Sequence, residues 1–245
     1  MKEFYDKMRG GAMATTALVN PFTARDAMER YLKQGKGVLY LAFSSGLSGS
    51  CQSAIAAGKE LEEKCPGMVA VVDTLAASMG QGLLVYYAAE YRKGGHNLSE
   101  TAAYIEDLKH RLCHYFTVND LFHLYRGGRV KKSTAIVGTI LKIKPLLHVD
   151  TEGHLIPVKN IMGRKKALLG LVDRMEEKTK GVKNDIVFIS HGDCIEDAEF
   201  VKKEITERFG IQNFVISGIG TVVGSHSGPE TVALFFVGTG KAEAK

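Results

Sequence analysis

The sequence predicts an α/β protein of two domains, the first with a mostly parallel sheet and the second with a mixed sheet that includes an antiparallel hairpin. Strand-like and helix-like segments alternate as far as about residue 111, which is typical of a parallel sheet covered by helices. Further on, the turn sequence Asp150–Gly153 separates two strand-like segments and indicates a hairpin. Because a hairpin does not belong in a doubly wound sheet, we expect domains of residues 1–111 and 112–245.

Each element of the first domain has a local signal. Asn20 before Pro21 predicts a helix start, with Asn as the N-cap and Pro in the first turn. Asn97 and Glu100 have the spacing of a capping box. Glycines at 80 and 82 predict a loop that leads into the next helix. We expect strands at 38–43 and 68–72, and helices at 1–8, 21–34, 51–64, 83–92 and 97–112.

The second domain is expected to be richer in strands. Its glycine-containing segments 127–129 and 224–229 read as a turn and a loop. We expect strands at 115–118, 146–149, 154–158, 185–190, 214–217 and 232–237, and helices at 119–126, 133–141, 165–178 and 195–209.

Composition narrows the class of protein. The 245 residues can bury a sizeable core, and no apolar run reaches the roughly 18 residues that suggest a membrane helix. The N-terminus shows no signal peptide. The four cysteines and the histidines lack ligand or disulfide spacing. We therefore expect a cytoplasmic protein without a metal or another cofactor.

The net charge of +5 is unevenly distributed. Ten Lys and Arg residues lie between Arg126 and Lys166 against two acidic residues, so this stretch carries +8 and the remaining residues together −3. A basic region on a mildly acidic chain suggests an anionic ligand or an acidic partner surface, and a solvated face is the alternative. Nucleic acid is disfavoured, because no recognition motif accompanies the charge.

The segment Ser44–Ser50, here called the serine loop, joins a predicted strand to a predicted helix. Ligands of open α/β sheets bind at this position, and a helix N-terminus favours an anion. The hydroxyls of Ser45, Ser48 and Ser50 add donors, while Gly46 and Gly49 permit close approach of a ligand. A simple turn with an N-cap is the alternative.

Residues 224–229 place His226 between glycines, which favours a close backbone approach. A loop histidine is nevertheless more often structural than functional. Pairing of Ser48 with His226 would suggest a serine hydrolase, but the serine loop lacks the Gly-x-Ser-x-Gly elbow and no third member stands out.

Together these motifs resemble the DegV family of bacterial fatty-acid-binding proteins. The matches occur in one order and span nearly the whole chain. They are the segment 44–54, Asp73 with 78–82, and the segments 127–130, 143–147 and 224–229.

The resemblance implies two α/β domains with a long-chain fatty acid between them and no enzymatic activity. By position, Thr16 and Ser48 would hold the carboxylate. The residues expected beside the head group are Ser45, Arg129, Arg164 and His226. The family usually reads Thr-Ser-Gln at the threonine, where this chain has Thr16, Ala17 and Leu18.

Some members of this family present the bound acid to a separate fatty acid kinase and then hold the acyl phosphate. The alternative function is a phosphotransferase or small-molecule kinase subunit that binds phosphate through its basic region. No Walker loop is present in the sequence.

Family members also begin with a strand that carries Thr-Asp-Ser, ahead of a helix like Glu3–Met8. No such strand precedes that helix here. We therefore expect the first sheet to lack one strand and to leave a slot or an exposed edge beside Val38–Phe43.

Overall fold

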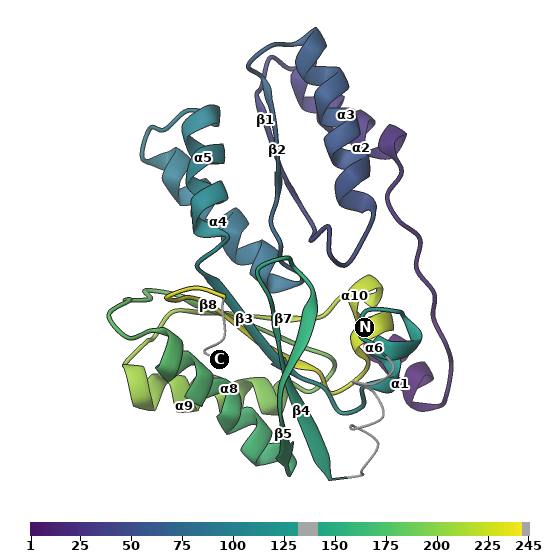
Figure 1. Cartoon of the computed structure of the whole chain (residues 1–245), viewed down its shortest axis with the longest axis vertical. Coiled ribbons are helices and arrows are strands. Elements are labelled where there is room, and N and C mark those ends of the chain that lie inside the picture. Colours follow the sequence, from purple (N-terminus) through teal and green to yellow (C-terminus); the bar gives the residue numbers. More distant parts are fainter. Residues whose placement is uncertain (132–141, 242–245) are drawn as a thin grey trace.

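The computed structural model describes residues 1–131 and 142–241. They form two sheets, one above the other, each with its own helices (Figure 1). The upper sheet consists of two parallel strands, β1 (Val38–Ala42) and β2 (Val69–Asp73). The lower sheet has six strands of mixed direction. The predicted α/β fold with a parallel first sheet and a mixed second sheet is confirmed.

Helices lie on both sides of the upper sheet (Figure 1). Two of the predicted helix starts have the expected caps. The Asn20 side chain accepts a hydrogen bond from the Thr23 amide at 2.9 Å, and Asn97 and Glu100 form a capping box. The four helices are α2 (Pro21–Leu32), α3 (Ser50–Lys64), α4 (Met79–Lys93) and α5 (Leu98–Leu108).

Strand β1 pairs with β2 and, within the described residues, with no other strand. Among the described residues, β1 thus has an edge without a strand neighbour beside Val38–Ala42. Every two-stranded sheet has such edges, so the missing strand stays a prediction.

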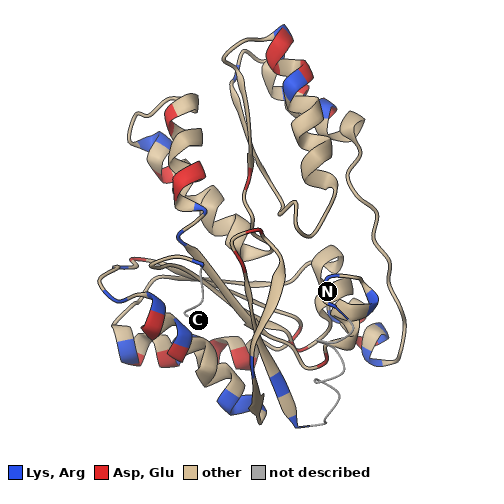
Figure 2. Cartoon of the chain, viewed as in Figure 1, with Lys and Arg blue, Asp and Glu red and all other residues tan. Residues whose placement is uncertain are grey.

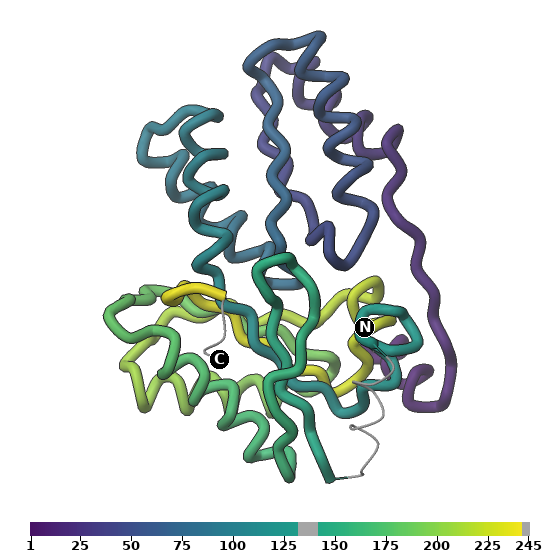
Figure 3. The backbone as a smooth tube through the Cα atoms, in the orientation of Figure 1, coloured from purple at the N-terminus to yellow at the C-terminus, as the bar shows by residue number. Residues whose placement is uncertain are grey.

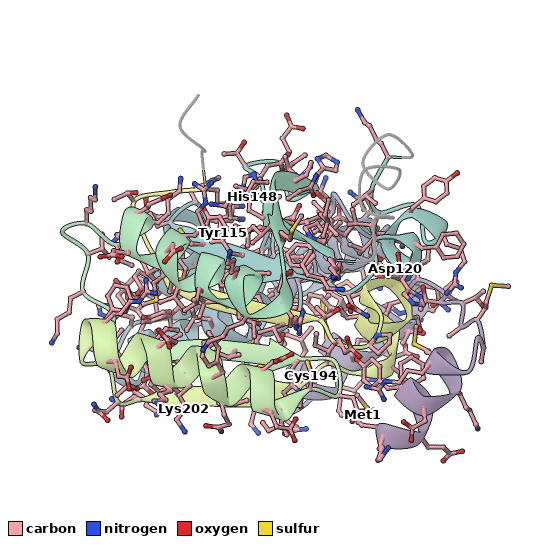
Figure 4. All side chains as sticks on the ribbon, turned by 90° about the horizontal axis from the view of Figure 1, so that it is seen from below. Met1, Tyr115, Asp120, His148, Cys194 and Lys202 are labelled. Carbon is pink, nitrogen blue, oxygen red and sulfur yellow. The ribbon has the colours of Figure 1, made fainter. Side chains whose placement is uncertain are left out.

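The lower sheet has the order β5-β4-β3-β8-β6-β7. Only β6 and β7 are parallel, and β4 and β5 form the predicted antiparallel hairpin. Helices α8 (Arg164–Lys178) and α9 (Ile195–Phe209) lie side by side across one face, which Figure 4 shows from below. The strands are β3 (Leu112–Thr117), β4 (Ile143–Val149), β5 (Leu155–Met162), β6 (Val187–His191), β7 (Phe214–Gly218) and β8 (Val232–Val237).

Helix α4 lies between the two sheets and contacts strands of both. One hydrophobic core runs through this region, because Val72 of β2, Leu83 of α4 and Phe235 of β8 belong to the same buried cluster. A domain division at residue 112 thus remains a prediction, although β3 begins the second sheet at that residue.

The N-terminal helix α1 (Lys2–Arg9) packs on the lower half, where the Tyr5 hydroxyl donates to the Ile219 carbonyl at 2.8 Å. Residues 10–20, here called the N-terminal arm, then run along the outside of the molecule up to α2 (Figure 3). Two short helices, α6 (Phe122–Arg126) and α10 (Thr221–Ser227), lie beside this path and contact each other.

Several bounds differ from the prediction. Strands β3 and β4 each begin three residues earlier, β5 ends four residues later, and α6 begins three residues later. Helix α4 starts at Met79 instead of residue 83, so Gly80 lies inside the helix. A Cβ on Gly80 would lie 2.9 Å from the Phe235 ring. The glycine therefore permits close packing inside a helix and does not mark a loop. Helix α5 ends at Leu108, before the predicted residue 112. The predicted loop at 224–229 is helical over residues 224–227, which belong to α10. The helix predicted at 133–141 lies outside the described residues.

No helix among the described residues is long and apolar enough to span a membrane.

Candidate functional site

A cavity of about 500 Å³ lies where the serine loop, the N-terminal arm, α4, α6 and α10 meet. Most of its wall is apolar. Polar side chains come from the arm, the serine loop, α4 and the lower half of the molecule. The apolar residues are Ala17, Leu18, Val19, Tyr40, Ala42, Phe43, Leu47, Ala77, Leu124, Val222 and Val223, and the polar ones are Thr16, Ser48, Ser50, Gln81, Arg129, His226 and Ser227.

The serine loop brings Ser48 and Ser50 to the N-terminus of α3. The Ser48 hydroxyl donates to Ser50 Oγ at 3.0 Å, and the Ser50 amide donates to Ser48 Oγ at 3.2 Å. Ser50 Oγ also accepts from the amide of Val19 at 3.0 Å, which ties the arm to the loop. These hydroxyls lie at the positive end of the helix dipole, where an anion is stabilised.

Thr16 of the arm and His226 of α10 meet in the cavity, with Oγ1 and Nε2 2.8 Å apart. Burial is the main cause that lowers the pKa of His226, and the positive charges of Arg129 and Arg126 lower it further. The imidazole is therefore neutral at neutral pH, so it can either donate to or accept from the threonine hydroxyl, depending on its tautomer.

Arg129 reaches the serine loop from the lower half of the molecule. Its Nε donates to the Leu47 carbonyl at 3.1 Å, and a terminal nitrogen donates to the Gly127 carbonyl. Since Leu47 precedes Ser48, the guanidinium lies beside the serine. The structure thus brings together Thr16, Ser48, Arg129 and His226, four of the six residues predicted from the sequence.

The other two predicted residues, Ser45 and Arg164, do not line this cavity. The Ser45 amide donates to Asp73 Oδ1 at 3.2 Å. The Arg164 guanidinium donates to Asp197 Oδ2 at 2.9 and 2.6 Å, and to the Glu230 carbonyl at 2.6 Å. Arg164 is therefore held by a carboxylate outside the cavity.

Among the described residues, the lysines and arginines of the basic stretch are spread over several elements. They lie in or beside α6, β4, β5 and the start of α8 (Figure 2). Arg129 is the member of this stretch that lines the cavity.

Sequence reasoning missed two polar residues of the cavity. The sequence predicts a loop at Gln81, but this residue lies on α4 and its side chain donates to the Leu41 carbonyl at 2.8 Å. Ser227 is 6% exposed, and its Oγ has no hydrogen-bond partner among the described residues. The motif at 224–229 contains Ser227, but a motif alone does not tell which hydroxyl faces a cavity.

The hydrogen bonds do not form a hydrolase pair. Within residues 1–131 and 142–241, the hydroxyl of Ser48 bonds to Ser50 and the ring of His226 bonds to Thr16. No group of three or more His, Cys, Asp or Glu residues that could hold a metal ion occurs in the same part of the chain.

Comparisons with known proteins identify the family. The family model described as "Uncharacterised protein, DegV family" matches residues 1–239. The chain belongs to the DegV family. A DegV domain-containing protein of Clostridium perfringens is 46% identical over 241 residues, which cover 98% of this chain and 83% of the relative.

Solved DegV structures share this fold. A fatty-acid-binding DegV protein from Thermus thermophilus is 30% identical, with a TM-score of 0.85 over 97% of this chain and 84% of that one. The Fak B3 protein of Streptococcus pneumoniae, a fatty acid kinase protein loaded with linoleic acid, has a TM-score of 0.85 over 96% of this chain and 83% of its own. At 18% identity, this second likeness shows the fold alone.

Proposed function

We propose that this DegV protein binds a long-chain fatty acid in the cavity, with the carboxylate held by Thr16 and Ser48. The observation that carries the proposal is that the cavity wall has a polar part and a larger apolar part. Thr16, Ser48, Arg129 and His226 line the same cavity, where Thr16 bonds to His226 and Arg129 bonds to the serine loop, and most of the remaining wall is apolar. An amphiphile with one anionic end matches such a wall.

The two ends of the ligand have different roles. Burial of a methylene contributes about 0.8 kcal/mol, so roughly a dozen buried carbons contribute on the order of 10 kcal/mol before ordering costs. A hydrogen bond from a hydroxyl to a carboxylate contributes only about 1.5–3 kcal/mol. The tail therefore sets the affinity, while Thr16 and Ser48 set the orientation of the acid.

Fatty acid binding by the Thermus thermophilus relative supports the choice of ligand. We further propose that the protein has no catalytic activity and presents the carboxylate to a separate fatty acid kinase. We also propose that the protein works in the cytoplasm, because its four cysteines show no disulfide spacing in the sequence.

Native mass spectrometry of the protein purified from bacteria tests this function. We expect co-purified long-chain acids, released by denaturation and identified by mass. A preparation that carries no acyl chain, and that binds none after delipidation and addition of palmitate, would contradict the proposal. Turnover of ATP by the isolated chain would instead support the phosphotransferase alternative.

A further inference from the structure

The turn between β4 and β5 packs against the serine loop and is hydrogen-bonded to it. In Figure 3 this hairpin rises from the lower sheet towards the carboxyl ends of β1 and β2. Ser44 is completely buried, and its hydroxyl donates to the Gly153 carbonyl at 2.8 Å. The same Ser44 oxygen accepts from the Gly46 amide at 3.2 Å. One side chain thus links the turn of the lower half to the loop of the upper half.

The contact leaves no space for a Cβ on either side. A Cβ on Gly46 would lie 2.8 Å from the Glu152 carbonyl oxygen and 2.9 Å from the Gly153 carbonyl carbon. A Cβ on Gly153 would lie 2.1 Å from Ser44 Oγ. Gly153 also has a φ of +82°, which side chains rarely adopt. Two glycines therefore allow the loop and the turn to pack backbone against backbone.

The turn is itself held in a fixed shape. Asp150 Oδ1 accepts from the amides of Glu152 and His154, both at 2.9 Å. The Gly153 amide donates to the Asp150 carbonyl at 3.2 Å, and the Asp150 amide donates to the His154 carbonyl at 3.0 Å. Since β4 and β5 continue the six-stranded sheet, the position of the Gly153 carbonyl is fixed by the lower half of the molecule.

Hydrogen bonds to Ser44 fix the backbone position of Ser48 in turn. The amides of Leu47 and Ser48 both donate to the Ser44 carbonyl, each at 3.1 Å. The backbone of Ser48 is therefore one hydrogen bond from Ser44, and two from the hairpin turn. Asp73 holds Ser45 from the upper half at the same time.

We propose that Ser44 and Gly153 are positioning residues, which hold the serine loop in the shape that places Ser48 for the ligand's head group. The inference rests on the proposed function, because it assigns to the turn a role in binding at the same cavity. A change at the turn should then weaken fatty acid binding even though the turn does not line the cavity.

The variant Gly153→Ala tests this, with Gly181→Ala as its control. Gly181 has a φ of +77°, and a Cβ there would meet nothing within 4 Å. Both variants place an alanine at a similar positive φ, but only Gly153→Ala pushes against Ser44. We expect Gly153→Ala to lower the affinity for a fluorescent long-chain fatty acid at least tenfold and Gly181→Ala to leave it unchanged. Equal affinities of the two variants would overturn the inference.

The double variant Ser44→Ala, Gly153→Ala removes the oxygen that the new methyl group meets. We expect it to regain part of the affinity that Gly153→Ala loses, because the two changes are coupled through this contact. Ser44→Ala alone adds no atom and remains informative if Gly153→Ala fails to fold. It should lower the affinity about threefold or more, since it removes both hydrogen bonds of the hydroxyl, and wild-type affinity would contradict the inference.

Amide hydrogen exchange at Ser48 separates this inference from the proposed function. We expect faster exchange of the Ser48 amide in Gly153→Ala than in Gly181→Ala, with unchanged exchange in β6. If the wild-type protein binds no fatty acid, the proposed function fails, while the exchange still reports whether the turn positions Ser48. Unchanged exchange at Ser48 would refute the positioning role.

Discussion

Replacement of Ser48 by alanine should weaken binding of the acid through its head group and leave the fold intact. The lost hydrogen bond to a carboxylate is worth about 1.5–3 kcal/mol, or about 10- to 100-fold in affinity at about 1.4 kcal/mol per tenfold. In the free protein the Ser48 hydroxyl already donates to Ser50 Oγ at 3.0 Å. Binding exchanges one hydrogen bond for another, so we expect the lower end, about tenfold.

Displacement of a fluorescent fatty acid measures this change, with palmitate and its methyl ester as competitors. The ester keeps the tail but lacks the charge, so Ser48→Ala should cost palmitate more affinity than the ester. Thr16→Val should behave in the same way. Ser99→Ala, at an exposed position of α5, is the control and should bind both ligands like wild type. An equal loss for acid and ester, or no loss for the acid, would refute the assignment of the carboxylate.

Three further predictions follow from the described contacts. Ser227→Ala should weaken binding of the acid by about threefold to tenfold, because a buried hydroxyl without a partner gains one when the ligand is bound; an affinity equal to wild type in the same displacement assay would exclude this contact. The variant Arg129→Gln should reduce formation of acyl phosphate with a partner kinase far more than it reduces affinity for the acid, and unchanged phosphorylation in a reconstituted reaction would contradict a role of Arg129 in phosphate handling. Burial lowers the pKa of His114 from 6.5 to about 3, so the folded state disfavours the protonated imidazole. The protein should therefore lose about 1.4 kcal/mol of stability per pH unit as the pH falls from about 6.5 towards 3. The stability of His114→Leu, measured by denaturant unfolding, should depend less steeply on pH, and the same dependence as in wild type would contradict this cause.

Local signals in the sequence predict most of the fold. The N-cap at Asn20, the capping box at Asn97 and the turn at Asp150–Gly153 all act within a few residues, and the structure confirms each of them. The start of α4 could not be predicted, because Gly80 packs against Phe235, which lies far away in the sequence. A glycine required by such packing looks the same in a sequence as a glycine in a loop.

Contacts between distant parts of the sequence also explain why only part of the candidate site could be predicted. The position of Ser48 between a strand and a helix is a local signal, but the pairing of Thr16 with His226 joins residues 210 apart in the sequence. The contact of Ser44 with Gly153 spans 109 residues, and no local pattern indicates it. Arg164 was predicted beside the head group because of its charge, but the structure pairs this charge with Asp197. A sequence does not tell whether an arginine has a partner within the protein.

A crystal structure of the protein with a long-chain fatty acid brominated at its terminal carbon tests the central claim most directly. We predict a carboxylate within hydrogen-bond distance of Thr16 and Ser48, roughly 2.5–3.0 Å between oxygen atoms. The anomalous signal of bromine should lie in the apolar part of the same cavity. A carboxylate bound away from both hydroxyls, or a bromine peak outside this cavity, would contradict the account.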